Sequence, residues 1–395
     1  MNFLFVCGGS AGHINPALAI AEELHRKIPE ANILFVGAGK ALEKRLIPEA
    51  GFDLVNIRMS GLRRGFSPGD VLHNIKTAWN LFIAGFKAAK LLKEFKPDAV
   101  IGTGGYINYP VLKKASKKGI PTYVLEPNAY PGLVVRMLSA VVDKIFVTYE
   151  GLESSYKRPE RIVYTGTPLR SKFLESGSDL DKETERTSKQ KERPLIISYW
   201  GSLGAAGMNN KILDLIKLNV EERRFDHIHA TGISGCAGEM KARLTSMGIT
   251  EVEPPFADIK GYITDMPAVM RDADIVISRA GASTIVELTS MGKPAILIPS
   301  PNVTENHQEE NAKRLQKAGG AIMILESECT GKILFDTITS LLDNKDRLEK
   351  MSAAQKSLSV SDAASKIVDI VLVDLQGLKR VSNHRDAARY AVDQN

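Results

Sequence analysis

The sequence predicts an α/β protein whose two domains are each built on an open parallel β-sheet. Short runs of β-branched and apolar residues recur along the chain, and each is followed by a glycine-rich turn and a helix-length stretch. This is the pattern of parallel β/α units. The length of 395 residues corresponds, at about 150 residues per domain, to two domains or three small ones.

Five strands are expected in each half of the chain. In the first half they occupy residues 3–7, 33–36, 99–101, 122–125 and 144–147, and in the second half residues 195–199, 227–230, 275–278, 295–298 and 321–324. In open α/β sheets, ligands bind at the loops that follow the carboxyl ends of the strands. We therefore expect the chemistry of this protein in those loops.

A polar segment separates the two series of units. Within 175–193 the only apolar residue is Leu180, so this stretch cannot bury enough surface to offset its ordering entropy. The expected order is an N-terminal domain, a linker or disordered insertion, a C-terminal domain, a helix that packs back on the N-terminal domain and a polar tail that frays, over residues 1–170, 171–193, 194–360, 361–375 and 376–395.

Composition excludes several other classes of protein. The chain is 44% hydrophobic and 25% charged, with 32 glycines and 18 prolines, which excludes a collagen, a long disordered chain and a disulfide-stapled miniprotein. No apolar run approaches the roughly 20 residues of a membrane-spanning helix, and residues 1–7 carry no basic region before their apolar stretch. We expect a protein that is neither secreted nor integral to a membrane. The cysteines Cys7, Cys236 and Cys329 lie far apart, which indicates no zinc knuckle or redox pair and fits a reducing compartment.

Positive charge is concentrated in the first half of the chain. Residues 1–170 hold 23 Lys and Arg against 14 Asp and Glu, whereas residues 171–395 hold 29 against 32. Between Arg63 and Lys118 there are eleven basic residues and three acidic ones. This density indicates a surface for an anionic partner, either nucleic acid or anionic lipid.

The helix expected over 75–95 has two apolar faces, although a helix that packs on one sheet needs only one. One face holds residues that fall within about 40° on a helical wheel, namely Ile75, Trp79, Phe82 and Phe86. The opposite side holds Leu81, Ala84, Ala88, Leu91, Leu92 and Phe95. The aromatic face, flanked by lysines, predicts a membrane-surface helix over anionic headgroups. A domain or dimer contact is the alternative. A nucleic-acid partner is less favoured, because two apolar faces leave no polar side of this helix to contact a nucleic-acid groove.

The first strand is followed by a loop of small residues that opens a helix near Asn15 and Pro16. The loop consists of Gly8, Gly9, Ser10, Ala11, Gly12 and His13. Small residues let the backbone approach an anion, and a helix start supplies N–H groups and a positive dipole end. The loop matches neither the dinucleotide fingerprint nor the nucleotide-hydrolase phosphate loop. A tight turn that needs glycine for its backbone is the alternative.

His13 ends this loop and is a candidate general base. The intrinsic pKa of histidine suits proton abstraction near neutral pH, and a position at a helix start keeps the ring neutral. A helix-capping role is the alternative.

Two more loops of the first half carry candidate residues. Gly102, Thr103, Gly104, Gly105 and Tyr106 follow one strand, and Glu126 and Asn128 follow the next. Glu126 is either a second candidate base or the carboxylate that orients His13. Asn128 either binds a sugar hydroxyl or fixes its own loop.

The second half of the chain also contains glycine-rich turns that lead from a strand into a helix. Residues 201–206 predict another anion cradle, and the helix start after strand 275–278 offers N–H groups to phosphate from Ala282, Ser283 and Thr284. Glu287, one turn further, accepts two ribose hydroxyls in this interpretation or, in the alternative, only stabilises the helix dipole. The amide-rich run 302–311 is typical of a loop that binds sugar hydroxyls.

No metal site is indicated. Two Asp-x-Asp pairs lie in the polar insertion and directly before a strand, and a pair of histidines on one strand is more typical of core or surface than of a metal site. These residues are Asp179, Asp181, Asp272, Asp274, His227 and His229. Leaving-group charge would instead be met by helix ends, Ser202 and Arg170.

Seven segments in register resemble the MurG family of peptidoglycan N-acetylglucosaminyltransferases. They are GGSAGHINPALAIA at 8–21, SGLRR at 60–64, KPDAVIGTGGY at 96–106, NAYPGL at 128–133, GTPLR at 166–170, GSLGA at 201–205 and SRAGASTIVEL at 278–288. The resemblance implies a GT-B architecture, with two Rossmann-like parallel-sheet domains that face a central cleft. It also implies an inverting hexosyltransferase of cell-wall synthesis, linked to cell shape and division. Such an enzyme moves N-acetylglucosamine from its UDP donor to the 4-hydroxyl of lipid-linked muramyl-pentapeptide, with no obligatory cofactor.

The resemblance also implies roles for individual residues. Donor contacts fall on Ser10, Ala11, Gly12, Asn128, Arg170, Ser202, Ile263, Ala282, Ser283, Thr284, Ile285, Val286, Glu287 and Gln308. Among them Ile263 would meet the uracil, and Gln308 the sugar. The acceptor pyrophosphate falls on Gly8, Gly9, Gly104, Gly105 and Tyr106. The candidate bases are His13 and Glu126, and the membrane face is Ile75, Trp79, Phe82, Phe86, Lys87 and Lys90.

The family resemblance places the protein peripherally on the cytoplasmic face of the cell membrane. Its partners would be the two substrates, anionic inner-membrane lipids and cell-wall synthesis proteins, without nucleic acid. Leu125, Pro127 and Leu203 stand where the family commonly has His, Gln and Gln. A glycolipid synthase or a UDP-sugar epimerase of the same fold therefore stays open, as does a non-catalytic partner that recruits an enzyme to the membrane.

Overall fold

The structure is a computed structural model and describes residues 1–59, 61, 67–171, 173, 193–201, 204–232, 236–249, 256–303 and 306–392, with the side chains of Cys236 and of residues beyond 378 left out. Nearly all of the expected insertion, and also Ser202 and Leu203, lie outside these residues. The chain forms two compact units. The first comprises Met1–Pro127, Pro131–Arg170 and Val360–Asn395, and the second Asn128–Tyr130 and Ser171–Ser359.

The first unit is built on a seven-stranded parallel sheet with the order β3-β2-β1-β4-β5-β6-β7. Its strands are β1 (Asn2–Val6), β2 (Asn32–Gly37), β3 (Asp53–Asn56), β4 (Ala99–Gly102), β5 (Thr122–Glu126), β6 (Lys144–Val147) and β7 (Ile162–Tyr164). Phe3 and Phe5 point into one buried layer and Leu4 and Val6 into the other. Both faces of β1 are therefore covered, which explains its continuous apolar sequence.

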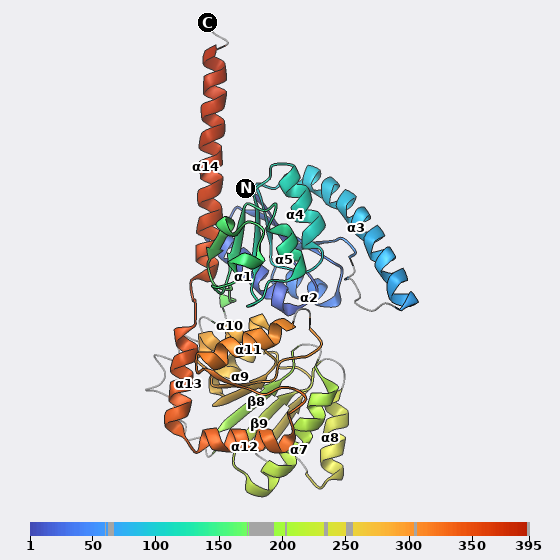
Figure 1. Ribbon diagram of the computed structural model, residues 1–395, viewed down its shortest axis with the longest axis vertical. Coiled ribbons are helices and arrows are strands. Elements are labelled where there is room, and N and C mark those ends of the chain that lie inside the picture. The colour runs from blue at the N-terminus through green and yellow to red at the C-terminus, as the bar shows by residue number, and fades with distance from the viewer. Residues whose placement is uncertain are drawn as a thin grey trace. The chain divides into compact units, whose positions relative to one another are not determined.

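Helices cover both faces of this sheet (Figure 1). They are α1 (Ala11–Lys27), α2 (Ala41–Glu49), α3 (Pro68–Phe95), α4 (Asn108–Lys117), α5 (Leu133–Leu138) and α14 (Ala363–Val392), with short 3₁₀ turns at Glu153–Ser155 and Pro159–Arg161. The helix expected from residue 75 begins earlier, at Pro68. Ser67 caps it by accepting a hydrogen bond from the backbone N–H of Asp70 at 3.2 Å.

The C-terminal helix α14 corrects the expectation of a helix over 361–375 followed by a fraying tail, because it continues to Val392. Residues 376–392 hold no proline and a single glycine, Gly377, so nothing in them stops a helix.

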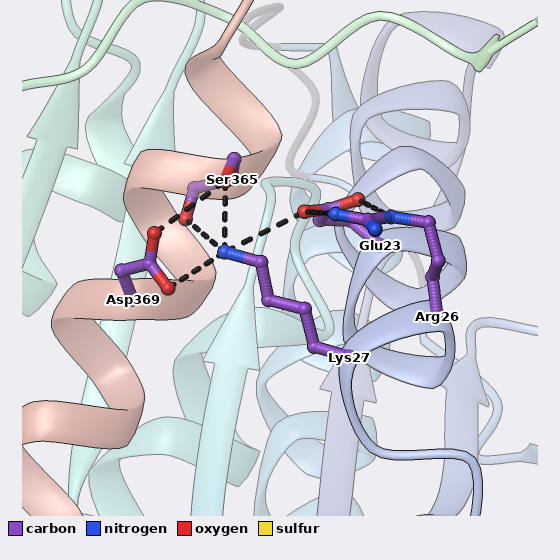
Figure 2. A network of polar contacts seen from close by, with 5 residues as sticks. All are labelled: Glu23, Arg26, Lys27, Ser365 and Asp369. Carbon is purple, nitrogen blue, oxygen red and sulfur yellow. Dashed lines mark hydrogen bonds and ion pairs between the residues drawn. The ribbon is translucent and has the colours of Figure 1, made fainter.

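The first half of α14 packs on α1. Figure 2 shows the Lys27 side chain of α1 reaching toward Ser365 and Asp369 of α14, with Nζ 2.8 Å from Ser365 Oγ and 2.6 Å from Asp369 Oδ1.

The same network includes Glu23, which lies one turn before Lys27. Arg26 donates to Glu23 through Nε and Nη2, each at 2.8 Å. These hydrogen bonds hold the pKa of the Glu23 carboxyl below its usual value. Glu23 therefore stays ionised where α1 meets α14.

The second unit has a six-stranded parallel sheet with the order β10-β9-β8-β11-β12-β13. Its strands are β8 (Leu195–Tyr199), β9 (Asp226–Ala230), β10 (Ala257–Lys260), β11 (Ile275–Ser278), β12 (Ala295–Leu297) and β13 (Ala321–Met323). Its helices are α7 (Ala206–Glu222), α8 (Cys236–Ser246), α9 (Met266–Asp272), α10 (Ala282–Met291), α11 (His307–Lys317), α12 (Gly331–Leu342) and α13 (Lys345–Ser357). The prediction of two Rossmann-like α/β domains is confirmed.

The structure contains three strands that the sequence did not predict in addition to the expected ten, and all three lie at sheet edges. They are β3, β7 and β10, and their residues are mostly half-buried or exposed. Because an edge strand is only partly covered, it lacks the apolar run by which central strands are recognised. Among the described helices, none has the length and apolar character needed to cross a membrane.

Candidate active site

Several helices that follow glycine-rich turns start without a capping side chain, and three of them carry candidate anion sites. The helices α1, α7 and α10 have no side-chain hydrogen bond at their N-cap and no acidic residue in the first turn. By contrast, α3, α9, α12 and α13 are capped by Ser67, Asp265, Thr330 and Asn344. The first-turn N–H groups and the positive dipole ends of α1, α7 and α10 are therefore suited to an anion.

In the first unit, His13 lies in the first turn of α1 and is held by Thr103. His13 Nδ1 is 2.9 Å from the Thr103 carbonyl oxygen, and Thr103 Oγ1 donates to the His13 carbonyl oxygen at 2.6 Å. A carbonyl only accepts, so Nδ1 carries the hydrogen and the basic lone pair of the neutral ring lies on Nε2. No role for Thr103 is predicted from the sequence, although this residue lies within the second glycine-rich turn.

The two glycine-rich turns of this unit pack tightly on each other. A Cβ atom at Gly104 would lie 2.3 Å from His13 Nδ1, and one at Gly105 would lie 2.5 Å from the Gly8 carbonyl oxygen. Both glycines have positive φ, +113° and +88°. Close packing alone therefore requires glycine at these two positions. Tyr106, the next residue, is 36% exposed.

Ser10, Ala11 and Gly12 form the start of α1. Ser10 is the N-cap residue, and its carbonyl accepts from the backbone N–H of His13 at 3.1 Å. Gly9 has a positive φ of +94°, although a Cβ atom built on it would meet no other atom within 4 Å. The backbone conformation, and not a lack of space, therefore favours glycine at this position. Gly8 lies against Glu43 of α2.

Glu126 is buried at the end of β5 and shapes the loop that follows. Its Oε2 accepts from the backbone N–H of Gly132 at 2.8 Å, which fixes the turn before α5. The partner that the structure places on His13 Nδ1 is the Thr103 carbonyl and not the Glu126 carboxylate. The two roles expected for Glu126, a second base or the carboxylate that orients His13, stay predictions.

Arg170 and Asn128 each have a partner within their own unit. Arg170 pairs with Glu22 of α1, with Nη2 at 2.8 Å and Nε at 3.1 Å from Oε1. Asn128 belongs to the second unit, where Asn311 Nδ2 lies 3.4 Å from Asn128 Oδ1. Asn311 is fully buried and also accepts from Ala129 N at 2.8 Å. Sequence reasoning included Asn311 only in a polar run and missed its structural role.

In the second unit, polar side chains gather where β8 and β11 end. Tyr199 and Ser278 are buried there, and Thr284 and Glu287 of α10 face the Tyr199 hydroxyl. Burial raises the pKa of Glu287 to about 8. Among the described residues, the buried Oγ of Ser283 has no hydrogen-bonding partner. Such an atom at an uncapped helix start is consistent with a polar ligand.

The remaining residues predicted to contact the donor lie in different surroundings. The side chains of Ile263 and Ile285 are buried in the hydrophobic core, Ala282 is also buried, and Val286 is half-buried. Gln308 Oε1 accepts from Ser300 N at 2.9 Å, which fixes the loop after β12. Ser202 lies outside the described residues.

Arg279 has no role in the sequence predictions but occupies a central position at the carboxyl ends of the strands of the second unit. It is 9% exposed, and its Nη1 donates to the Ile298 carbonyl at 3.1 Å and lies 2.6 Å from Glu326 Oε2. Its guanidinium also lies 5.7 Å from the centre of the Trp200 ring. Arg279 thus connects the segments that follow β8, β11, β12 and β13. The sequence feature that could have indicated Arg279 is its position in the segment SRAGAST, which follows strand β11.

The histidine pair of β9 is part of the core. His227 and His229 are buried, and both lie within hydrogen-bonding distance of Ser198 Oγ, at 2.8 and 2.7 Å. Burial lowers the pKa of His227 to about 3 and that of His229 well below its usual value. Both rings are therefore neutral. Within the described part of the chain, no three His, Cys, Asp or Glu side chains group as metal ligands do.

The predicted membrane face of α3 projects large apolar side chains. Ile75, Trp79, Phe82 and Phe86 are 59–64% exposed. The rings of Trp79 and Phe82 stack at 5.9 Å, and Phe82 and Phe86 meet edge to face at 4.8 Å. A groove of about 290 Å³ lies between α3 and α4 and is lined by Leu81, Phe82, Gly85, Phe86, Tyr109, Pro110, Lys113, Lys114 and Lys117. Lys87 and Lys90 are exposed beside it.

Known protein families match both halves of the chain. Residues 3–147 match the glycosyltransferase family 28 N-terminal domain, and residues 197–367 match the glycosyltransferase family 28 C-terminal domain. A protein of Acetivibrio thermocellus is 40% identical over 94% of this chain and 97% of its own length. One of Ruminiclostridium cellulolyticum is 41% identical over 94% and 99%. Both are named UDP-N-acetylglucosamine–N-acetylmuramyl-(pentapeptide) pyrophosphoryl-undecaprenol N-acetylglucosamine transferase.

Solved structures share the fold. MurG of Acinetobacter baumannii superposes with a TM-score of 0.70 at 24% identity, covering 94% of this chain and 99% of that one. The UDP-GlcNAc 2-epimerase of Neisseria meningitidis superposes with a TM-score of 0.64 at 16% identity, covering 94% and 100%. At these identities the likeness establishes the fold and does not distinguish a transferase from an epimerase.

Proposed function

Because this chain belongs to the MurG family of N-acetylglucosaminyltransferases, we propose that it transfers N-acetylglucosamine from UDP-N-acetylglucosamine to the muramyl sugar of undecaprenyl-pyrophosphoryl-muramyl-pentapeptide. This is the reaction that converts lipid I to lipid II in peptidoglycan synthesis. The observation that carries the proposal is the fixed ring of His13, whose basic nitrogen is set by Thr103 at the uncapped start of α1. That arrangement supplies a base beside an anion-binding helix end, as sugar transfer from a diphosphate requires.

His13 acts as the general base in this proposal. Its Nε2 takes the proton of the muramyl 4-hydroxyl while that oxygen attacks the anomeric carbon of the donor sugar. The bond between the anomeric carbon and the diphosphate breaks, UDP leaves with the electron pair, and the configuration at the anomeric carbon inverts. Glu126 is the second candidate base, although one of its oxygens already accepts from Gly132.

The donor is held mainly by the second unit in this proposal. The uncapped start of α10 binds the diphosphate through backbone N–H groups, and Glu287 accepts the ribose hydroxyls. The uracil meets Ile263, and the sugar meets Gln308. The remaining proposed donor contacts are Ser10, Ala11, Gly12, Asn128, Arg170, Ser202, Ala282, Ser283, Thr284, Ile285 and Val286. No metal is obligatory, because helix ends and side chains meet the charge of the leaving UDP.

The acceptor approaches from the first unit. Its pyrophosphate is proposed to lie by the two glycine-rich turns, at Gly8, Gly9, Gly104, Gly105 and Tyr106. The exposed aromatic residues of α3 enter the headgroup layer, and the lysines of α3 and α4 bind anionic lipid. The enzyme would thus work peripherally on the cytoplasmic face of the membrane, where cell-wall synthesis proteins are further candidate partners.

The test is transfer of radiolabelled N-acetylglucosamine from its UDP donor to the lipid-linked muramyl-pentapeptide in phospholipid vesicles. We expect a labelled lipid product that forms equally in the presence of a metal chelator. Diacylglycerol replaces the acceptor in a parallel reaction, and the donor alone is assayed for epimerisation. Product only with diacylglycerol, or epimerised donor without any lipid, would contradict the proposed acceptor.

A further inference from the structure

A buried carboxylate that the proposed reaction does not use lies beneath the first glycine-rich turn. Glu43 is the third residue of α2 and is fully buried. A buried charge is unfavourable unless hydrogen bonds compensate for the lost water. The groups that bind Glu43 therefore explain why it is present.

Glu43 accepts three backbone hydrogen bonds from two different turns. Its Oε1 accepts from Gly9 N at 2.8 Å, in the turn after β1. Its Oε2 accepts from Gly39 N at 2.7 Å and from Lys40 N at 2.9 Å, in the turn after β2. Hydrogen bonds to an ionised carboxylate are stronger than neutral ones. Glu43 thus connects two loops at the carboxyl ends of neighbouring strands.

Capping of α2 explains only part of this arrangement. A glutamate at the third helical position commonly accepts from the N-cap backbone, here that of Lys40. The bond to Gly9 spans 34 residues of sequence and does nothing for α2. Two glycines also leave room for the carboxylate, because a Cβ atom at Gly8 would lie 3.1 Å from Oε1 and one at Gly37 only 2.7 Å from Oε2.

The Gly8–Gly9 turn is connected to the His13 ring by two routes. Along the chain, Gly9 precedes Ser10, whose carbonyl accepts from His13 N at 3.1 Å. Through space, the Gly8 carbonyl packs against Gly105, whose neighbour Gly104 packs against the ring itself. A shift of the turn therefore moves both the start of α1 and the surface on which the ring rests.

We propose that Glu43 is a positioning residue that sets the location of His13 by holding the Gly8–Gly9 turn. This inference rests on the proposed function, in which His13 is the base. It has a consequence for the acceptor, because the Gly9 N–H already donates to Glu43. The pyrophosphate would then bind to N–H groups further along the loop, and Gly9 would contribute conformation only.

The test is Glu43→Gln, which keeps the shape of the side chain. A glutamine has one acceptor oxygen and one NH₂ group, so it satisfies the N–H groups of one turn and opposes those of the other. We expect kcat to fall by roughly 10- to 100-fold, the range produced by small misplacements of a catalytic group. The dissociation constant of UDP, which lacks the transferred sugar, should change less than about twofold, because the proposed diphosphate, ribose and uracil contacts lie on the second unit.

The matched control is Glu49→Gln on the same helix, whose side chain is exposed. It removes the same charge without touching either turn and should keep wild-type kcat. Nitrogen-15 NMR of the His13 ring supplies a second measurement, independent of turnover. The wild type should show the hydrogen on Nδ1, and Glu43→Gln should show a mixture of ring forms. A role in stability alone would leave the ring form unchanged at temperatures well below unfolding.

A second variant covers the case in which Glu43→Gln does not fold. Gly37→Ala, at a residue outside the proposed acceptor contacts, places a methyl group 2.7 Å from Glu43 Oε2 and displaces the carboxylate, and it should give the same kcat loss in weaker form. Normal turnover and an unchanged ring form in the folded variants would overturn the inference. A lower KM for the lipid acceptor with unchanged kcat would also overturn it, since Glu43 would then compete with the pyrophosphate. An inactive wild type would instead refute the proposed function.

Discussion

His13 Nδ1 and the carbonyl oxygen of Thr103 lie 2.9 Å apart, and Thr103 Oγ1 returns a hydrogen bond to the His13 carbonyl. The two residues are 90 positions apart in sequence. His13 lies at the start of the helix that follows β1, and Thr103 lies in the turn after β4, the neighbour of β1 in the sheet. Thr103 therefore fixes the ring in one form before any substrate binds. Preorganisation of this kind would lower the cost of proton transfer if His13 is the base, as proposed above, because the ring would need no reorientation during the reaction.

Replacement of His13 tests the role of the ring as the base. His13→Ala should lower kcat by roughly 10²- to 10⁴-fold, the usual contribution of a general base. His13→Asn places an amide N–H near the position of Nδ1 and keeps the hydrogen bond to Thr103, but it has no Nε2. It should lose as much turnover as the alanine variant while unfolding closer to the wild-type temperature. The dissociation constant of UDP, measured by calorimetry, should stay unchanged in both.

A different outcome would reassign the base. If His13→Ala turned over at near wild-type rate, Glu126 would take its place. Glu126→Gln would then be the inactive variant. In the present proposal, Glu126→Gln affects the turn at Gly132 and lowers activity less than His13→Ala does.

The sequence predicted the parts of the fold that depend on repeated local patterns. Central strands such as β1 and β11 were recognisable because both faces are buried. The two helix starts at Ser10 and Gly281 were recognisable from glycine and small residues at strand ends. The edge strand β3 was not, since only one of its four residues is even half-buried.

Contacts between distant segments could not be predicted in the same way. Thr103, Glu43, Arg279 and Asn311 act through hydrogen bonds between their side chains and backbone atoms of distant segments. Backbone N–H and carbonyl groups carry no sequence signature, so a single sequence does not show which residue will bind them. Gly104 illustrates the point, because the sequence does not show that the His13 ring leaves no space for a side chain there; its contact with the pyrophosphate stays a prediction.

Donor binding should depend on pH through Glu287. Burial raises the pKa of this carboxyl to about 8, so in the ligand-free protein it is mostly protonated at pH 7. Ribose hydroxyls that donate to it favour the ionised form, so binding releases a proton. Affinity for UDP should therefore rise with pH, by up to about tenfold per unit below pH 8, and level off above it. Calorimetry in buffers of different ionisation enthalpy measures the released proton.

The variant Glu287→Gln should bind UDP more weakly and lose that proton release. It also tests the effect on folding. A carboxyl whose folded-state pKa is raised costs stability as the pH rises from about 4.5 to 8, because the unfolded chain ionises first. Glu287→Gln should therefore be more stable than wild type at pH 8, by on the order of 1–3 kcal/mol. Equal proton release in the two proteins would exclude a ribose contact at Glu287.

The exposed face of α3 should control binding to lipid. The double variant Trp79→Glu and Phe82→Glu replaces two rings that are 64% and 59% exposed with carboxylates, which anionic headgroups repel. Sedimentation with vesicles of anionic phospholipid should show at least about a tenfold loss of binding. Affinity for UDP should not change, because the proposed nucleotide contacts lie on other elements.

The control for the α3 variant is Leu358→Glu, which alters an exposed leucine of the second unit. It should bind vesicles as wild type does. High salt should weaken binding of the wild type, since part of the attraction comes from Lys113, Lys114 and Lys117. If the double variant sedimented with vesicles as fully as wild type, α3 would not be the membrane face.

Docking of α14 on the first unit should depend on Asp374. Its Oδ1 lies 2.7 Å from Lys144 Nζ, and its Oδ2 accepts from the Tyr123 hydroxyl at 3.1 Å. Tyr123 is 1% exposed, and burial and the nearby Asp374 raise its pKa, so the phenol stays a donor and needs an acceptor. Asp374→Ala leaves that buried hydroxyl unsatisfied and should cost about 1–3 kcal/mol of unfolding free energy.

The control for Asp374 is Glu94→Ala in α3, whose partner Lys90 lies at 3.7 Å with both side chains well exposed. An exposed pair one helical turn apart contributes only about 0.3–0.5 kcal/mol, so its urea midpoint should barely move. Since α14 closes the apolar layer over Tyr123 and Phe146 through Ile367 and Val371, loss of Asp374 should also expose amides of α14 to hydrogen exchange before the sheet opens. Equal urea midpoints for the two variants would mean that apolar packing alone holds α14, and that Asp374 contributes no more than a surface ion pair.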